Sequence, residues 1–259
     1  MAPPPHSVLI TGASSGLGAA LARACAAPGI TLHVSGRDAA RLEATVMSCA
    51  RSGARVLPQV LDVRDADAMA AWISGAGPLD LVIANAGIGT GTGEGQEDAA
   101  AARVVFETNV TGVLNTVLPA LAVMAAQPAG ADGWRGHVAV IASIAAFVAA
   151  PSAPAYNASK AAVQRWTEAR APSEAKRGIA MHCVCPGFVR TPMTELNEFP
   201  MPWLLEPDEA ARRTLAGIAA GRLRIVYPRR LYALARMVGA LPPGWRHALL
   251  GRAPPKRAH

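Results

Sequence analysis

A glycine-rich turn between an apolar strand and a helical stretch constrains the fold of this chain more than any other feature. The run HSVLITG is followed by TGASSGLG and then by LGAALARACAA, which has helical spacing and ends at Pro28 and Gly29. At this junction Gly12 allows a tight turn, Gly16 lets the backbone approach a pyrophosphate, and Gly18 lets strand and helix pack closely. Because the helix N-terminus then faces negative charge, the turn predicts a dinucleotide phosphate site.

The rest of the chain alternates between strand-like and helix-like segments. Helical runs separate the apolar segments ITLHVSG, ARVLPQVLDV, LDLVIANAG, GHVAVIAS, IAMHCVCPG and LRIVYP, and one of those runs extends from about Glu97 to Gln127. This order predicts an α/β fold: a Rossmann-type, doubly wound, parallel sheet of about seven strands, with helices on both faces. We expect a single dinucleotide-binding catalytic domain over residues 1–228. A basic helical extension and tail follow over residues 229–259, with disorder beyond Gly251.

Composition narrows the class of protein. A chain of 259 residues, 51% of them hydrophobic, can bury one sizeable core. No basic and apolar leader precedes Thr11, and no run of about 18 apolar residues occurs, so we expect neither a secretory signal nor a transmembrane helix, and a cytoplasmic location. We also expect the four cysteines to be free thiols. The pair Cys183 and Cys185 is not expected to share a metal, on the premise that alternate strand residues face opposite sides of the sheet.

The net charge of +7 comes from the C-terminal fifth of the chain. From Ala210 onward there are eleven Arg and Lys and no Asp or Glu, whereas the first 209 residues hold the other fourteen basic residues and all eighteen acidic ones. The overall charge therefore gives no reason to expect nucleic-acid binding. The segment RRLYALARMVGALPPGWRHALL combines an apolar stripe with arginines. Three arrangements stay open for it: peripheral contact with an anionic membrane, contact with a second subunit, or packing on its own domain.

Seven short motifs occur in order along this alternation. They are TGASSGLG, LDV with Asp62, NAG at 85–87, NVTG with Asn109, Ser143 in VIASIAAF, YNASK at 156–160, and PGFVRT at 186–191. With these motifs the chain resembles the classical short-chain dehydrogenase/reductase family over nearly its whole length, to about residue 228. The resemblance implies an NAD(P)-dependent alcohol dehydrogenase or carbonyl reductase.

The resemblance also implies the roles of four catalytic residues. Tyr156 would be the general acid or base, and Lys160, one helical turn later, would favour its phenolate and bind the nicotinamide ribose. Ser143 would donate a hydrogen bond to the substrate oxygen, and Asn109 would hold a water in a proton relay. A different class stays open: an NAD(P)-binding regulatory or sensor protein without turnover.

The end of the second strand bears on which nicotinamide cofactor binds. Arg37 follows Ser35 and Gly36 and has a planar fork that suits a 2′-phosphate, whereas Asp38 lies near the spacing of a ribose-binding acid. We interpret Asp38 as the N-cap of the next helix, so NADP(H) is favoured and NAD(H) is the alternative. The complete set of expected cofactor-binding residues is Gly12, Ser14, Ser15, Gly16, Leu17, Gly18, Arg37, Asp62, Val63, Asn85, Ala86, Gly87, Pro186, Gly187, Val189 and Thr191.

The expected partners are a small apolar ketone or alcohol and a second copy of the chain. The segment between Pro192 and Pro207 is apolar, as a lid over a hydrophobic substrate would be, although the same residues could simply pack that segment onto the domain. The resemblance implies a homodimer or homotetramer. Pro172 falls in the helix that relatives commonly use as an interface, and we expect it to kink or shorten that helix. The substrate, the direction of reaction and the oligomeric state are not fixed by the sequence.

Overall fold

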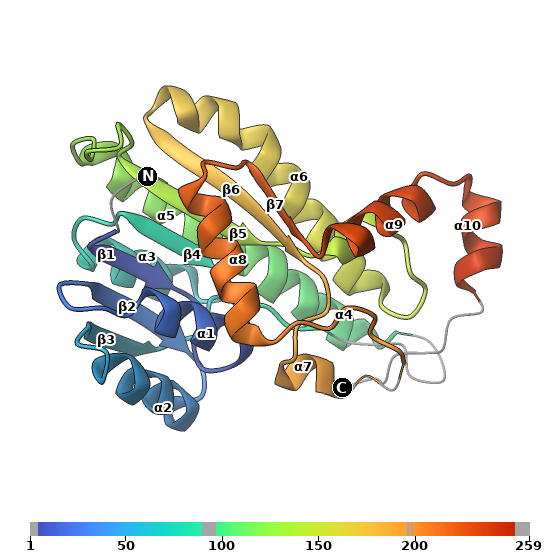
Figure 1. The fold of residues 1–259 in the computed structure, drawn as a ribbon, viewed down its shortest axis with the longest axis horizontal. Coiled ribbons are helices and arrows are strands. Elements are labelled where there is room, and N and C mark those ends of the chain that lie inside the picture. The colour runs from blue at the N-terminus through green and yellow to red at the C-terminus, as the bar shows by residue number, and fades with distance from the viewer. Residues whose placement is uncertain (1–4, 90–96, 196, 198, 252–259) are drawn as a thin grey trace.

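The computed structural model describes residues 5–89, 97–195, 197 and 199–251. Its centre is a seven-stranded parallel sheet with strand order β3-β2-β1-β4-β5-β6-β7 (Figure 1). The strands are β1 (Ser7–Ile10), β2 (Thr31–Gly36), β3 (Arg55–Val60), β4 (Leu81–Ala84), β5 (Gly136–Ile141), β6 (Ile179–Pro186) and β7 (Arg224–Tyr227). The predicted fold class is confirmed. The order reverses between β1 and β4, so a crevice for a ligand opens at their carboxyl ends.

Helices cover both faces of the sheet, and each face has its own buried core. On one face pack α1 (Gly16–Cys25), α2 (Ala39–Ala50) and α8 (Pro207–Ala219). On the other pack α3 (Ala66–Gly75), α5 (Gly112–Ala126) and α6 (Pro154–Lys176). All four residues of β4 are buried, which is why that strand has an uninterrupted apolar sequence.

The long helical run predicted between Glu97 and Gln127 is divided into three parts. It comprises α4 (Ala99–Phe106), a π-helical turn η1 (Glu107–Thr111) and α5. Among the described residues, Ala99–Ala126 is also the one helix long and apolar enough to cross a membrane. Its residues Val113, Val117 and Leu121 are instead buried in the core against the sheet, as expected of a core helix.

Pro172 does not shorten α6. The helix continues from Pro154 through Pro172 to Lys176. Proline has no N–H to donate to the carbonyl four residues earlier, and the alternative expectation of a kink there stays a prediction. Nearby, the Ser173 hydroxyl donates to the Arg170 carbonyl at 2.7 Å and satisfies one acceptor of the last turns.

The cysteines are free thiols, but the reasoning about one pair needs correction. Cys49, Cys183 and Cys185 are buried and Cys25 is partly buried. Residues two apart on a strand share a face, so Cys183 and Cys185 point the same way, with their Sγ atoms 3.7 Å apart. The two thiols pack together in the core, and the hydrogen bond with Cys185, followed by burial, raises the pKa of Cys183.

The chain after the sheet forms α9 (Arg229–Gly239) and α10 (Pro243–Leu250), which project from one end of the molecule (Figure 1). Arg224 ties α9 to the domain: it makes a bidentate ion pair with Glu168 of α6, both N–O distances being 2.5 Å, and it donates to the Tyr232 hydroxyl at 2.8 Å. The tail predicted to be disordered beyond Gly251 lies outside the described residues.

Candidate active site

One cavity of about 870 Å³ lies at the carboxyl ends of the strands, a volume that suits a large ligand. Its walls come from the turn after β1 and from the ends of β2 to β6. All residues predicted to bind cofactor line it: Gly12, Ser14, Ser15, Gly16, Leu17, Gly18, Arg37, Asp62, Val63, Asn85, Ala86, Gly87, Pro186, Gly187, Val189 and Thr191. Ser143, Tyr156 and Lys160 also line it, whereas Asn109 does not.

The glycine turn has the geometry that its spacing predicts. Gly12 and Gly16 have φ angles of +67° and +53°, which residues other than glycine rarely adopt. A Cβ on Gly16 would lie 2.8 Å from the Thr191 side chain, and one on Gly18 would clash with the Gly12 carbonyl. The turn therefore leaves its backbone open to the cavity only because glycine occupies these positions.

Polar contacts fix this turn against the end of β4. The Asn85 amide donates to the carbonyls of Thr11 and Gly12 at 3.0 and 3.1 Å, and the Thr11 hydroxyl accepts from the backbone N–H groups of Asn85 and Ala86. Ser15, the N-cap of α1, makes no side-chain capping bond. Donors in the first turn of α1 thus remain available to an anion in the cavity.

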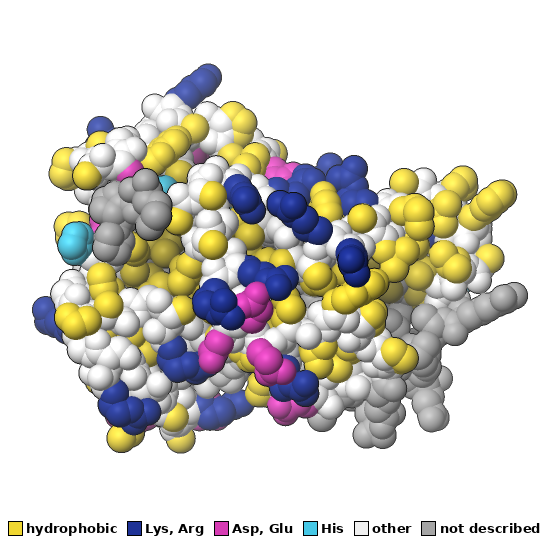
Figure 2. All heavy atoms as spheres, viewed as in Figure 1, with side chains coloured by type: hydrophobic (Ala, Val, Ile, Leu, Met, Phe, Trp, Pro, Cys, Tyr) yellow, Lys and Arg dark blue, Asp and Glu magenta, His cyan; other side chains and the backbone are white. Residues whose placement is uncertain are grey.

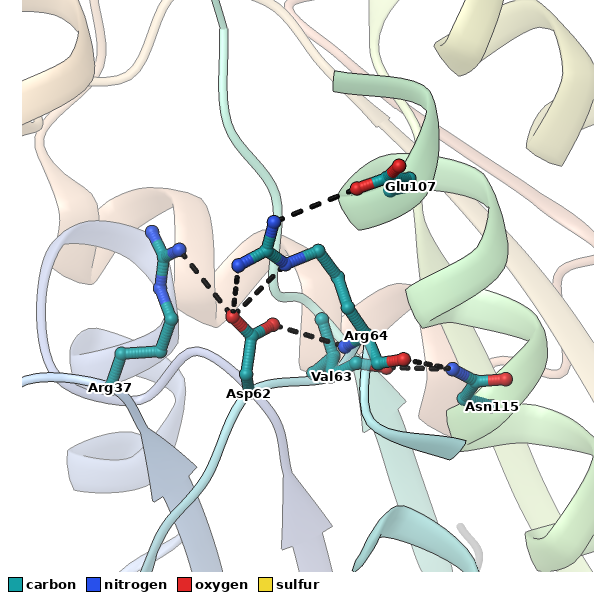
Figure 3. Close-up of polar contacts among 6 residues, drawn as sticks. All are labelled: Arg37, Asp62, Val63, Arg64, Glu107 and Asn115. Carbon is teal, nitrogen blue, oxygen red and sulfur yellow. Dashed lines mark hydrogen bonds and ion pairs between the residues drawn. The ribbon is translucent and has the colours of Figure 1, made fainter. Parts of the chain in front are cut away.

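Figure 3 shows the charged cluster where β2 and β3 end. Asp62 accepts from the Arg64 guanidinium at 2.7 and 3.0 Å and from the Arg64 backbone N–H at 3.0 Å. These hydrogen bonds are the largest reason that the pKa of Asp62 lies below its ordinary value. Arg37 Nη1 lies 3.7 Å from the same carboxylate, and Arg64 also faces Glu107 at 3.6 Å.

Arg37 keeps freedom to reach a ligand, because 56% of its side chain is exposed and it lines the cavity. Asp38 also lines the cavity, but its carboxylate is engaged within the protein. Its carboxylate caps α2 by accepting from the Arg41 backbone N–H at 2.9 Å and also pairs with the Arg41 side chain. The interpretation of Asp38 as an N-cap is therefore confirmed.

Three of the predicted catalytic side chains meet at the end of β5. Ser143 follows β5 and its Oγ accepts from the Ala145 N–H at 3.0 Å. Tyr156 lies in the first turn of α6; burial raises its pKa, and a hydrogen bond with Ser143 acts in the opposite direction. Lys160, one turn further along, has its Nζ 6.0 Å from the centre of the Tyr156 ring.

Lys160 is buried, and its ammonium has few partners in the protein. Its Nζ donates to the Ile141 carbonyl at 2.8 Å, and burial lowers its pKa to about 8. A Cβ on Gly87 would lie 3.2 Å from this Nζ, so glycine at that position makes room for the lysine. At pH 7 the lysine is mostly protonated, and its charge faces the cavity beside Tyr156.

Asn109 occupies η1 behind the cavity wall and is fully buried. Its amide accepts from the Ile88 N–H at 2.8 Å, donates to the Ile88 carbonyl at 2.9 Å, and donates to Ser159 Oγ at 3.0 Å. The side chain therefore fastens the loop after β4 to α6. The water relay expected of Asn109 stays a prediction.

The predicted lid is partly described. It begins with α7 (Pro192–Glu195), from which Met193 and Thr194 line the cavity, and Leu196 and Glu198 lie outside the described residues. Beyond them Phe199 contacts Phe188 edge-on at 6.0 Å, so this end of the segment packs onto the domain.

A model of the short-chain dehydrogenase family matches residues 6–199. The chain belongs to this family. An uncharacterized oxidoreductase of Myxococcus xanthus is 35% identical over 241 residues, covering 92% of this chain and 93% of that protein. A putative ketoacyl reductase for granaticin in Streptomyces violaceoruber is 33% identical over 224 residues, covering 83% and 79%.

Solved structures of short-chain dehydrogenases agree with the fold. One from Burkholderia phymatum in complex with NAD has a TM-score of 0.80 at 26% identity, covering 98% of this chain and 97% of that one. One from Sphingobium yanoikuyae in complex with NADPH has a TM-score of 0.77 at 25% identity, covering 98% of both chains. Structural relatives therefore hold either nicotinamide cofactor, and this short-chain dehydrogenase is an NAD(P)-binding oxidoreductase of that family.

Sequence reasoning missed other residues of this short-chain dehydrogenase that line the cavity, among them Ser35, Arg41, Leu61, Ile88, Thr108 and Ile141. It also missed Arg64, which holds Asp62. Leu61 and Ile141 lie inside the LDV and VIASIAAF motifs but were given no role, whereas the others belong to no motif and owe their positions to how neighbouring strand ends converge. A basic residue two positions after the LDV aspartate is the one signal that could have suggested Arg64.

Proposed function

We propose that this short-chain dehydrogenase is an NADP-dependent oxidoreductase that interconverts an apolar ketone and its alcohol by reversible hydride transfer at nicotinamide C4. The observation that carries the proposal is that one cavity joins three features. They are an open phosphate-binding turn at Gly16, a half-exposed guanidinium at Arg37, and the Ser143, Tyr156 and Lys160 side chains.

The cavity fits a dinucleotide on evidence apart from family membership. Ser35 Oγ lines the wall next to Arg37, is buried, and among the described residues has no hydrogen-bond partner. A buried hydroxyl without a partner is costly, and a polar ligand in the cavity would satisfy it. The glycine turn likewise leaves a cradle that any Cβ at Gly16 would obstruct.

When bound, NADPH supplies the hydride. Tyr156 donates its proton to the carbonyl oxygen of the substrate, and Ser143 donates a hydrogen bond to the same oxygen. The charge of Lys160 lowers the free energy of the phenolate that remains on Tyr156. In the oxidative direction Tyr156 accepts the proton instead.

Apolar lining near these groups supports a hydrophobic ketone as substrate. Ile88, Ala142, Pro186, Val189 and Met193 surround this end of the cavity. Relatives named as putative ketoacyl reductases act on carbonyl compounds, as their names state. The proposed substrate class is therefore a ketone with apolar substituents.

The choice of cofactor is tested by fluorescence titration of NADPH and NADH with the wild type, Arg37→Ala and the control Arg51→Ala. Arg51 is exposed at the end of α2, away from the cavity. Loss of a charge-assisted contact from a half-exposed arginine should weaken NADPH binding about tenfold and leave NADH binding unchanged. Equal weakening of both cofactors, or of neither, would contradict the role of Arg37.

Turnover is tested separately with Tyr156→Phe. We expect this variant to bind NADPH like the wild type and to lose NADPH oxidation with a panel of apolar ketones. A wild-type protein that binds NADPH tightly yet oxidises it with none of the ketones, nor reduces NADP with the alcohols, would support the regulatory binder instead.

A further inference from the structure

Exposed hydrophobic side chains gather on the two C-terminal helices. Of ten large hydrophobic residues exposed in the described part of the chain, four lie within α9 and α10. They are Leu234, Met237, Trp245 and Leu249, with exposed fractions of 44, 63, 74 and 55%. Figure 2 shows hydrophobic side chains concentrated at the end of the molecule that these helices form. The density of apolar surface is unusual for a face in contact with water.

Nothing in the described chain covers α10. None of its eight residues is buried, and Trp245 and Leu249 lie one turn apart on the same side. A helix this short gains little stability from its own hydrogen bonds, so packing of its apolar face against another body would stabilise it. An exposed indole beside aliphatic side chains also suits a boundary between apolar and aqueous surroundings.

The charge around this apolar surface favours a lipid membrane over a second copy of the chain as its binding partner. Arg229, Arg230 and Arg236 are exposed on α9, and no Asp or Glu occurs after Glu209 in the sequence. A two-fold contact with a second copy through this face would bring arginines against arginines. An anionic lipid surface matches both properties, because it accepts apolar side chains and attracts guanidinium groups.

The inner side of α9 packs on the domain next to the cavity. Ala235 and Val238 of α9 are buried, and Tyr232 packs edge-on against Phe147 with ring centres 5.0 Å apart. On the same helix Leu231 lies against Gly187, which lines the cavity. These contacts place the exposed side of α9 close to the cavity.

We propose that α9 and α10 dock the protein onto an anionic phospholipid bilayer, with Met237, Trp245 and Leu249 entering the interface and the arginines facing lipid headgroups. The docking requires neither nucleotide nor turnover, so it can be tested apart from the oxidoreductase proposal.

The test is sedimentation of the full-length protein with vesicles of phosphatidylcholine alone or of an equal mixture with phosphatidylglycerol. We expect binding to the anionic vesicles that weakens as salt is added. The double variant Arg229→Ala/Arg230→Ala should lower the partition coefficient roughly 30-fold, because each arginine near such a surface contributes about a fivefold gain. Trp245→Asp/Leu249→Asp should abolish binding.

The matched control is Met47→Asp/Arg51→Ala at α2, which removes an exposed hydrophobic residue and an exposed arginine from another part of the surface. It should bind vesicles as the wild type does. Unchanged NADPH affinity and melting temperature show that each variant is folded. Binding that is equal for all variants, or no binding to anionic vesicles, overturns the proposal. A fall in particle mass by light scattering in the Trp245→Asp/Leu249→Asp variant, without vesicle binding by the wild type, would show that the face is a subunit contact.

Discussion

Replacing Lys160 with methionine should stabilise the cofactor-free protein while removing its activity. The lysine is buried, and its pKa of about 8 lies below the ordinary value of 10.5 because burial disfavours the charged form. At about 1.4 kcal/mol per pH unit, this difference corresponds to roughly 3 kcal/mol of free energy that the folded state loses by carrying the charge.

Methionine has similar length and no charge, so the variant avoids this cost. It also loses the hydrogen bond from Nζ to the Ile141 carbonyl, and we expect this loss to cancel about 1–2 kcal/mol of the gain in stability. The net gain in the free energy of unfolding at pH 7 is then about 1–2 kcal/mol. For a chain of this size the melting temperature should rise by roughly 3–6 °C.

The pH dependence of the stability difference distinguishes removal of a buried charge from an improvement in packing by methionine. The unfolded chain binds the proton up to about pH 10.5, whereas the folded chain releases it above about pH 8, so wild-type stability rises with pH between these values. The advantage of Lys160→Met should therefore shrink by about 2 kcal/mol between pH 7 and pH 9.5.

The assay is urea unfolding followed by circular dichroism at both pH values, with Lys176→Met as the control. Lys176 is exposed near the end of the same helix and should show no such pH dependence. A variant that is less stable than the wild type at pH 7, by an amount that does not change with pH, would refute the reasoning. Such a result would mean that the buried ammonium carries no net cost in the folded state.

Three further changes test other parts of the structure. Glu168→Gln should cost about 2 kcal/mol at neutral pH by breaking the bidentate pair with Arg224. Burial alone would raise the pKa of Glu168, but hydrogen bonds from Arg224 lower it below its ordinary value of 4.5. In urea titrations the difference in stability between Glu168→Gln and the wild type should therefore disappear as the pH falls through that range. A difference that does not change with pH would argue against the ion pair. Burial lowers the pKa of His182 to about 4, so the wild type should lose roughly 3 kcal/mol between pH 6.5 and pH 4. His182→Gln should reduce this loss of stability between pH 6.5 and pH 4. An unchanged dependence of stability on pH would contradict the role of His182. Gly16→Ala should weaken NADPH binding in fluorescence titration and lower stability by about 1 kcal/mol, because its φ is +53° and its Cβ would meet Thr191; normal affinity would show that the turn adapts.

The sequence was sufficient to predict the sheet and most of the cavity, because local signals and family motifs coincide there. The glycine turn, the buried run at β4 and the YNASK segment each place a functional group at a strand end or helix start, where the parallel fold brings them together. Motif positions therefore predicted much of the cavity lining, although not Arg41, Ile88 or Thr108.

The features that the sequence did not predict depend on contacts between distant segments. The pairing of Arg64 with Asp62 and Glu107 involves the approach of β3 to the long helix. Asn109 was expected to hold a water in a proton relay, which stays a prediction, whereas the π-helical turn and its bonds to Ile88 and Ser159 behind the cavity wall were not foreseen. Propensity alone also suggested that Pro172 could end α6, whereas contacts such as those of the buried Glu174 with Arg170 and Arg177 extend the helix beyond it.

The π-helical turn at Glu107–Thr111 has a consequence for which changes in chain length this protein can tolerate. A π-helical turn accommodates an additional residue within a helix, and each residue added to or removed from an α-helix rotates the remainder of that helix by about 100°. Deleting the extra residue here would convert the segment to regular helix while α4 and α5 both keep their buried faces toward the sheet. A deletion inside α5 has no such turn to absorb it and would rotate the residues beyond it out of the core. A single-residue deletion in this turn should therefore disturb the fold less than one in α5, although it would displace Asn109 from Ile88 and Ser159.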